Sequence, residues 1–159
     1  MRKIIPFTIV TALVVLAFSL SAMAWKEAGK LQGQAQAGRS FSASLTGAAE
    51  TAGGDTDGKG EAKITLDPDK GEVCYELTAS SIDTATAAHI HEAAAGQDGP
   101  PKVTLDAPAG GASKGCKPAD AELIKQIMQN PANYYVNVHN KEFPKGALRG
   151  QLSASSGSR

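Results

Sequence analysis

Hydrophobic and polar residues alternate along much of the chain between residues 41 and 152, with the period of two that is typical of half-buried β-strands. In residues 72–77, for example, Val73, Tyr75 and Leu77 fall on one face. Stretches rich in Gly, Pro and Asp separate the alternating segments, as turns do. The pattern predicts an all-β fold, either an antiparallel β-sandwich or a Greek-key barrel. The expected strands are residues 42–46, 60–66, 72–77, 88–93, 102–105, 134–140 and 147–152.

One segment has a helical period instead. Between residues 119 and 129, four apolar residues occupy positions i, i+1, i+4 and i+5, which is the stripe of an amphipathic helix. Asn130 and Pro131 should end this helix, because Pro disfavours helical geometry at the residue before it and Asn tolerates the left-handed conformation. We expect the stripe to pack into the core. Its members are Leu123, Ile124, Ile127 and Met128.

Residues 1–24 have the composition of a secretory signal peptide. A basic start (Arg2, Lys3) precedes an apolar run over residues 9–20, and Ala22-Met23-Ala24 offers the small residues that a signal peptidase needs. The alternative, a membrane anchor, is disfavoured because the apolar run is short for a bilayer span. No Cys follows the predicted cleavage site directly, so a lipid anchor is not expected. We predict a secreted mature chain without a stable membrane anchor, in the periplasm or the extracellular medium.

Cleavage after Ala24 leaves 135 of the 159 residues, which suits one compact domain. Loss of the two basic residues of the signal leaves 14 basic against 16 acidic side chains, a net charge of −2. Without a basic patch or an aromatic-rich stripe, nucleic-acid binding is excluded. Residues 25–40 are expected to form a flexible leader and residues 153–159 a flexible tail, because both are poor in large apolar residues. The domain should cover residues 41–152.

Cys74 and Cys116 are the two cysteines of the chain. In an oxidising compartment an even pair is more often bridged than free, which favours a disulfide. The bond would close a loop of 42 residues, for which the chain-entropy model gives about 4 kcal/mol of stabilisation. Ligation of a metal by thiolates is the weaker alternative, because neither residue belongs to a C-x-x-C pair.

All three histidines lie in two of the expected strands. Because side chains alternate along a strand, His89 and His91 share one face, and His139 shares a face with Tyr135 and Asn137. Residues i and i+2 have Cα atoms about 7 Å apart on one strand face, so converging imidazoles can reach the metal–nitrogen distance of about 2.0–2.1 Å. If the two strands are neighbours, the three rings form a nitrogen set suited to copper or zinc.

Further polar residues would complete such a site. The fourth coordination position is open to water or to Glu50. Arg149 lies on the polar face of the last strand, where a buried guanidinium could pair with Glu50 and orient the site, although a solvated Arg on an outer face is an equal alternative. Two other interpretations of the histidines also stay open. They are hydrogen bonding to Asn137, Tyr135 or the backbone, and acid–base catalysis.

Other sequence patterns carry no comparable signal. No G-x-S-x-G, P-loop or paired-carboxylate motif is present, so hydrolase and nucleotide-binding functions lack support. Four aspartates are spaced like the oxygens of a calcium loop, but no twelve-residue loop ends in Glu, and turn formation explains them. They are Asp55, Asp57, Asp67 and Asp69.

Six pieces of the chain, in order, are F-S-A-S-L-T-G-A-A-E, V-C-Y-E-L, A-A-H-I-H-E-A-A-A-G-Q-D-G-P, G-C, N-P-A-N-Y-Y-V-N-V-H-N and F-P-K-G-A-L-R-G-Q-L. Through them residues 41–152 resemble a CHRD domain, a module named after chordin and found in many secreted bacterial proteins. The resemblance implies an extracellular all-β module and supports the pairing of Cys74 with Cys116, which match the family's cysteine positions. The chain departs from many bacterial members after Glu50, where Thr51-Ala52-Gly53 replaces a Val-Pro-Pro-like segment.

The H-x-H strand is also similar to the copper-binding strand of Cu,Zn superoxide dismutases, and the expected fold is immunoglobulin-like or Cu,Zn superoxide dismutase-like. Three histidines cannot build the two-metal site of those enzymes, so dismutase activity is not predicted. We predict a binding or structural module of the cell envelope in which His89, His91 and His139 hold one copper or zinc ion. The alternative is a metal-free module that binds an unknown envelope or extracellular protein, as chordin suggests. A metal-dependent redox enzyme is the least favoured hypothesis.

Overall fold

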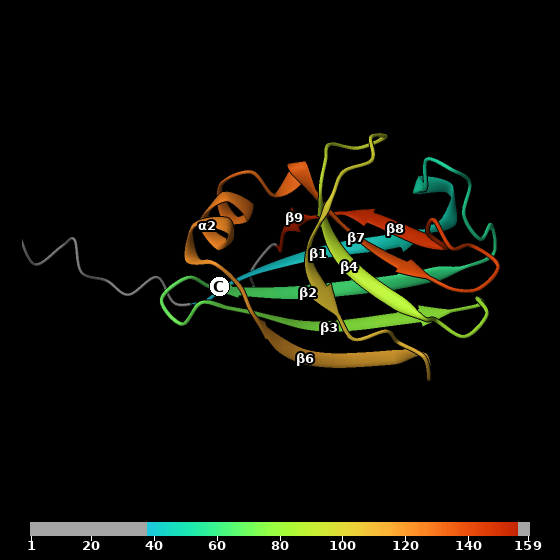
Figure 1. Ribbon diagram of the computed structural model, residues 1–159, viewed down its shortest axis with the longest axis horizontal. Coiled ribbons are helices and arrows are strands. Elements are labelled where there is room, and N and C mark those ends of the chain that lie inside the picture. The colour runs from blue at the N-terminus through green and yellow to red at the C-terminus, as the bar shows by residue number, and fades with distance from the viewer. Residues whose placement is uncertain (1–37, 156–159) are drawn as a thin grey trace, which may run out of the picture. The chain divides into compact units, whose positions relative to one another are not determined.

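Eight antiparallel strands form a nearly closed barrel, with one short α-helix packed against it (Figure 1). The computed structural model describes residues 38–155, so the predicted signal peptide, most of the predicted leader and the end of the tail lie outside the described residues. The prediction of an all-β fold is confirmed. Of the two predicted architectures, a sandwich and a barrel, the chain adopts a barrel. The elements are β1 (Arg39–Thr46), η1 (Gly47–Ala49), β2 (Lys59–Asp67), β3 (Glu72–Ser80), β4 (Ala87–Glu92), β5 (Pro101–Leu105), β6 (Ala112–Pro118), α2 (Ala121–Gln129), η2 (Pro131–Asn133), β7 (Tyr134–His139), β8 (Leu148–Gln151) and β9 (Ser153–Ala154).

The strand order around the barrel is β5-β4-β7-β8-β1-β2-β3-β6, and the two-residue strand β9 pairs with β1. The connections from β3 to β4 and from β6 to β7 join strands that are not neighbours. They bring β4, β7 and β8 together, although these strands are far apart in the sequence. The barrel also begins at Arg39 and its last pairing ends at Ala154, two residues beyond each expected limit of the domain.

The hydrophobic core fills the inside of the barrel. Val73, Tyr75 and Leu77, which were expected to share a face, are all buried there. On β4 and β7, Ile90 and Val136 are fully buried as well. Because neighbouring residues of a strand point to opposite faces, the residues that alternate with these two point out of the barrel. The histidines occupy those outward positions.

Strand β6 is absent from the sequence prediction, because its seven residues alternate only between exposed and half-buried positions and include no apolar face. It forms by pairing with β3 along its whole length. Cys74 on β3 and Cys116 on β6 are direct partners in this pairing and are joined by a disulfide. The predicted disulfide is therefore confirmed, and it fastens a strand that buries little surface.

Asp106 bridges the gap in the barrel, which lies between the edge strands β5 and β6. These two strands approach each other without pairing. Its carboxylate accepts hydrogen bonds from the Tyr75 hydroxyl (2.7 Å) and the Lys117 ammonium (2.7 Å). Its backbone N–H donates to the same Tyr75 hydroxyl (3.0 Å), and its carbonyl accepts from Ser113 (2.7 Å). The hydrogen bonds from Lys117 and Tyr75 lower the pKa of Asp106 below its usual 3.8. One residue after β5 thus links β3, β5 and β6.

Helix α2 begins two residues later than expected and ends at the predicted place. The Asp120 side chain caps it by accepting from the backbone N–H groups of Glu122 (2.8 Å) and Leu123 (3.2 Å). Asn130 follows the helix, and Pro131 opens the short helix η2. Three residues of the predicted apolar stripe are buried against the barrel, which confirms their role in the core. They are Ile124, Ile127 and Met128.

Two of the aspartates with calcium-loop spacing stabilise turns. The Asp55 carboxylate accepts from the backbone N–H groups of Asp57 and Gly58, both at 3.1 Å, and Asp67 accepts from that of Lys70 at 3.0 Å. These bonds agree with the interpretation of these residues as turn formers.

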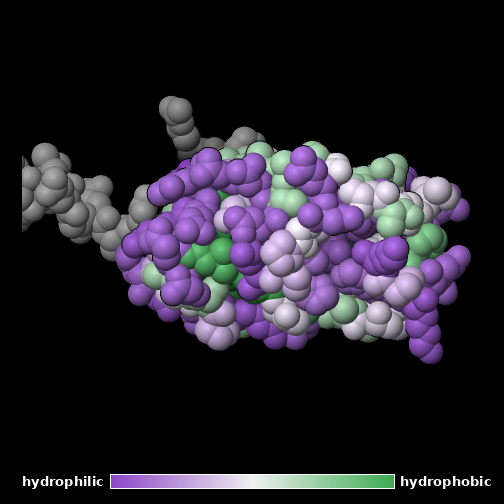
Figure 2. Space-filling model, turned by 45° about the horizontal axis from the view of Figure 1, so that its top comes forward, coloured by the Kyte–Doolittle hydropathy of each residue, from purple (hydrophilic) through white to green (hydrophobic). Residues whose placement is uncertain are grey.

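The face of the molecule in Figure 2 is mostly hydrophilic, and its hydrophobic residues form small separate areas. Areas of this kind are ordinary on protein surfaces and do not mark an extended apolar interface. Within residues 38–155, no helix has the length and apolar character needed to cross a membrane.

Candidate metal centre

Two paired strands place the three histidines on one outer face of the barrel. In the antiparallel pairing of β4 with β7, His89 lies opposite Asn137 and His91 lies opposite Tyr135. His139 is two residues beyond Asn137 on β7, so its side chain points to the same side as the others. The three imidazoles therefore converge, as the alternation of the two strands predicted.

The three rings lie close together, but as a set their nitrogens are farther apart than nitrogens bound to one ion. The ring centroids of His89 lie 5.4 Å from His91 and 5.2 Å from His139, and the other two rings are 6.5 Å apart. One ligand nitrogen from each ring lies within 4.8 Å of the others. Nitrogens bound to one tetrahedral ion at about 2.0–2.1 Å are roughly 3.3 Å apart. His89 Nδ1 and His139 Nε2 lie 3.2 Å apart, which is already close to this separation.

Backbone carbonyl groups orient two of the rings. His91 Nδ1 lies 2.8 Å from the carbonyl oxygen of Gly99, and His139 Nδ1 lies 3.1 Å from that of Pro144. Because a carbonyl only accepts, each Nδ1 carries the hydrogen and each Nε2 carries the lone pair. The Nε2 of His139 accepts a hydrogen bond from His89 Nδ1 (3.2 Å). His91 Nε2 is buried and has no hydrogen-bond partner within residues 38–155. Histidine ligands of metal ions are commonly held in this way.

Burial keeps two of the rings in the neutral form. Desolvation lowers the pKa of His89 below the usual 6.5, and the nearby rings of His139 and His91 lower it further. Desolvation also lowers the pKa of His139, although its hydrogen bond to Pro144 acts in the opposite direction. Neutral imidazole is the form that binds a metal, so this environment favours a ligand-competent state near neutral pH.

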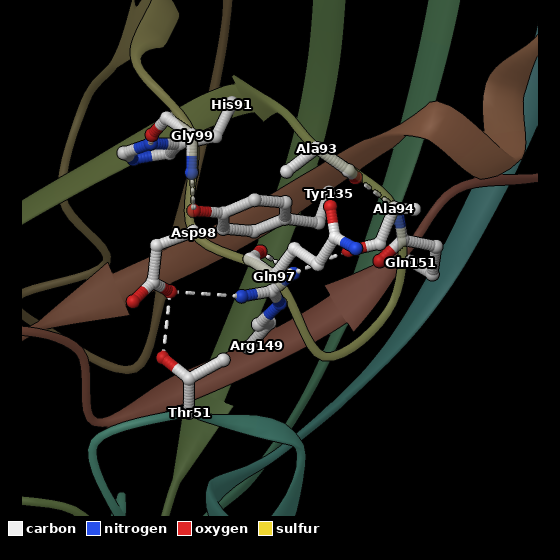
Figure 3. A network of polar contacts seen from close by, with 10 residues as sticks. All are labelled: Thr51, His91, Ala93, Ala94, Gln97, Asp98, Gly99, Tyr135, Arg149 and Gln151. Carbon is white, nitrogen blue, oxygen red and sulfur yellow. Dashed lines mark hydrogen bonds and ion pairs between the residues drawn. The ribbon is translucent and has the colours of Figure 1, made fainter.

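Tyr135 lies between His91 on β4 and Arg149 on β8, because β7 is the middle strand of the three (Figure 3). The Tyr135 ring stacks on His91 with a centroid distance of 4.8 Å and an interplanar angle of 11°. The Cζ atom of Arg149 lies 3.5 Å from the centroid of the same ring. This stack fixes the plane of the His91 ring.

Arg149 is 1 % exposed, which settles the choice between a buried and a solvated arginine. Its partner differs from the hypothesis, because Nη1 forms an ion pair with Asp98 (3.3 Å) and not with Glu50. Nη2 donates to the backbone carbonyls of Ala94 (3.2 Å) and Gln97 (2.6 Å). Arg149 therefore holds the loop that follows β4.

Other side chains fasten the same loop, residues 93–100, to the barrel (Figure 3). Gln151 Nε2 donates to the carbonyl of Ala93 (2.7 Å), and the Thr51 hydroxyl donates to Asp98 (2.6 Å). The backbone N–H of Gly99 donates to the Tyr135 hydroxyl (3.4 Å). Since Gly99 also orients His91, the position of this loop controls one of the three rings.

Glu50 follows η1 and is 9 % exposed, and its Oε1 has no hydrogen-bond partner within the described residues. Its carboxyl group packs against Gly146, where φ is +144°, and any side chain at position 146 would collide with it. Desolvation raises the pKa of Glu50 from 4.5 to about 7, although Arg149 lowers it and Asp98 raises it further. A buried carboxyl group that titrates near neutral pH is unusual and is typical of functional sites.

A pocket of about 330 Å³ opens beside the cluster and reaches His91 but neither of the other two histidines. Glu50, Asn137 and Lys145 belong to its wall. Asn137 is 2 % exposed, and its Oδ1 makes no hydrogen bond within residues 38–155. All four residues proposed around the histidines from the sequence thus lie near the cluster, with Arg149 acting through Tyr135 and the loop.

Sequence reasoning missed several residues that shape the site. Gly99 and Pro144 act through backbone carbonyls, which no side-chain pattern reveals. Asp98 could have been proposed from the sequence as a partner for Arg149, because it is the only charged residue in residues 93–100. Lys145 lies in the loop between β7 and β8 and had no signal of its own.

The barrel, the disulfide and the outward histidine cluster define an all-β domain of the kind found in oxidising compartments, with a group that could hold a metal ion. The family model of the CHRD domain matches residues 41–152, the limits expected from the sequence. The chain belongs to the CHRD domain family. Searches among curated proteins and among solved structures found no match.

Proposed function

We propose that this CHRD domain binds one copper or zinc ion through His89, His91 and His139 and serves as a binding or structural module of the cell envelope. The observation that carries the proposal is the convergence of three imidazoles from two paired strands, with ligand atoms within 4.8 Å of one another. Three nitrogen donors suit copper and zinc, whereas calcium and magnesium prefer oxygen.

Export to the periplasm or the medium is part of this proposal. The composition of residues 1–24 supports it, because a basic start, an apolar run and a small-residue cleavage site follow one another. The bond between Cys74 and Cys116 also supports it, since disulfides persist in oxidising compartments and are rare in the cytosol.

A bound ion would link β4 to β7 and supply a positive centre with an open coordination position. The carbonyl groups of Gly99 and Pro144 would hold two ligand rings in the required tautomer, and Tyr135 would hold the plane of His91. Capture of an ion or cross-linking by it needs nothing more than these residues. We therefore propose binding rather than a reaction.

Metal analysis of the refolded mature protein tests the proposal. We expect calorimetric titration with Cu(II) or Zn(II) to give one ion per chain, and His91→Ala to weaken binding by more than about 100-fold, because it removes a ligand outright. Asn133→Ala is the control, since Asn133 is exposed beside β7 and outside the cluster. Wild-type protein without stoichiometric binding would defeat the proposal. A protein partner recovered equally with chelator and with His91→Ala would then favour the metal-free module.

A further inference from the structure

Three buried hydrogen-bond acceptors belong to the wall of the pocket beside His91. Four buried side-chain nitrogen or oxygen atoms lack a hydrogen-bond partner within residues 38–155, and three of them come from residues that line this one pocket. They are Glu50 Oε1, Asn137 Oδ1 and His91 Nε2. The two oxygens accept, and His91 Nε2 accepts as well because Nδ1 carries the hydrogen. Buried polar groups nearly always have partners, so this wall calls for a ligand that donates.

We propose that in the metal-free protein this pocket binds a small protonated primary amine, of the size of methylammonium, through Glu50, Asn137 and His91. A primary ammonium group carries three N–H donors and no acceptor, so it matches three acceptors and leaves no lone pair without a partner. A water molecule donates only two hydrogen bonds, and its own lone pairs find no partner among these three atoms. The pocket has a volume of about 330 Å³, which is typical of the smaller ligand sites of proteins.

The charges around the pocket favour a cation. Glu50 is 9 % exposed and forms no ion pair within the described residues. Asp98 is paired with Arg149 at 3.3 Å, so these two charges compensate each other. Lys145 also lines the pocket, but it is exposed and solvent screens its charge. An ionised Glu50 is therefore a buried charge without a partner, whereas buried charges are normally paired.

The inference goes beyond the proposed metal site and does not depend on it. An ion would take the lone pair of His91 Nε2, so the ion and the amine exclude each other. The test therefore uses the mature protein freed of metal by a chelator. Its expected result is the same whether or not the protein also binds copper or zinc, so a failure of one proposal is distinguishable from a failure of the other.

Methylammonium chloride is the probe, titrated into isotope-labelled protein at pH 8, above the pKa of about 7 of Glu50. The methyl group of Ala52, which lines the pocket, reports binding in carbon–proton NMR spectra. We expect saturable shifts, with binding about tenfold weaker in Glu50→Gln because a charge-assisted hydrogen bond becomes a neutral one. Lys145→Met should tighten binding about threefold, since it removes a nearby positive charge. The matched controls, Glu61→Gln and Lys141→Met, change the same charges at exposed positions outside the pocket and should leave binding unchanged.

Two further cations, tetramethylammonium and potassium, carry the same charge without an N–H group. Saturable binding of methylammonium alone, weakened in Glu50→Gln and not in Glu61→Gln, supports the amine site. Equal binding of all three cations shows a general charge effect and overturns it. Absence of a saturable shift, which would mean that water alone fills the pocket, overturns it as well, and so do equal affinities of the Glu50 and Glu61 variants. Methyl signals remote from the pocket, recorded in the same spectra, show that each variant is folded.

Discussion

The guanidinium of Arg149 lies over the ring of Tyr135, with Cζ 3.5 Å from the ring centroid. A cation at this distance is attracted by the electron-rich face of the ring, and burial strengthens the attraction. His91 stacks on the same tyrosine from the neighbouring strand. Within residues 38–155, Arg149 forms no hydrogen bond to a histidine, and it is coupled to His91 through a single aromatic side chain.

Arg149→Lys tests this coupling. The ammonium of Lys cannot reach one carboxylate and two carbonyls in different directions, so we expect about 2 kcal/mol of lost stability and about tenfold weaker copper binding. Urea unfolding and copper titration measure the two effects. Arg39→Lys is the control, because Arg39 is exposed and its Cζ lies 5.7 Å from the Phe41 ring. Similar losses in both variants would contradict the role assigned to Arg149.

The sequence predicted the part of the site that depends on local geometry. The side chains of a strand alternate with a period of two, so the faces of His89 and His139 followed from their positions alone. That the two strands would be neighbours was only a condition in that argument, because the crossing connections of the barrel decide it. The CHRD motifs predicted the span that the family model matches, residues 41–152, and the barrel extends two residues beyond it at each end.

The partner of Arg149 could not be predicted in this way. A polar residue on the outer face of a barrel is normally exposed, and Arg149 is buried only because residues 93–100 fold back over β8. Its ion pair with Asp98 spans 51 positions of the sequence and depends on the path of that loop. Strand β6 was missed for a related reason. It is held by its pairing with β3 and by the disulfide, and it has no apolar face that a sequence pattern could reveal.

Glu50→Gln should stabilise the metal-free protein at alkaline pH. The native state holds the Glu50 proton up to a pH of about 7, whereas the unfolded chain releases it near 4.5, so wild-type stability falls as the pH rises between these values. Gln carries no such proton. Allowing for solvent screening, we expect the variant to be more stable by about 1–2 kcal/mol at pH 8 and equal to wild type at pH 4.

Urea unfolding at both pH values with a chelator present measures this effect. The control is Glu61→Gln, at an exposed position of β2, which should change stability equally at both pH values. A Glu50→Gln variant with no gain at pH 8 relative to pH 4 would show that burial does not raise the Glu50 pKa.

Replacement of Cys74 and Cys116 by Ser should lower stability without abolishing metal binding. The bond joins residues 42 positions apart, and its loss should cost about 4 kcal/mol in the chain-entropy model. Strands β4 and β7 are separated from the β3–β6 pair in the sheet order, so the histidine cluster should persist while the variant is folded. Urea unfolding and copper titration test this, with near-ultraviolet circular dichroism to show that the variant is folded. A folded variant without copper binding would contradict the independence of the two features.

Acidification should release zinc only below the usual range of histidine titration. Protons compete with the ion for each ring, and the pKa values of His89 and His139 both lie below 6.5 because of burial. We therefore expect the apparent Zn(II) affinity to be nearly constant from pH 8 to about 6.5 and then to fall steeply, with a slope set by the number of rings that take up protons. The same two rings make the metal-free protein lose stability as the pH falls below 6.5, since the unfolded chain accepts their protons first. Calorimetric titrations across this range measure the affinity. A decline that is already complete at pH 7 would mean that the rings are not held neutral, and the buried cluster would then be a poor site for an ion.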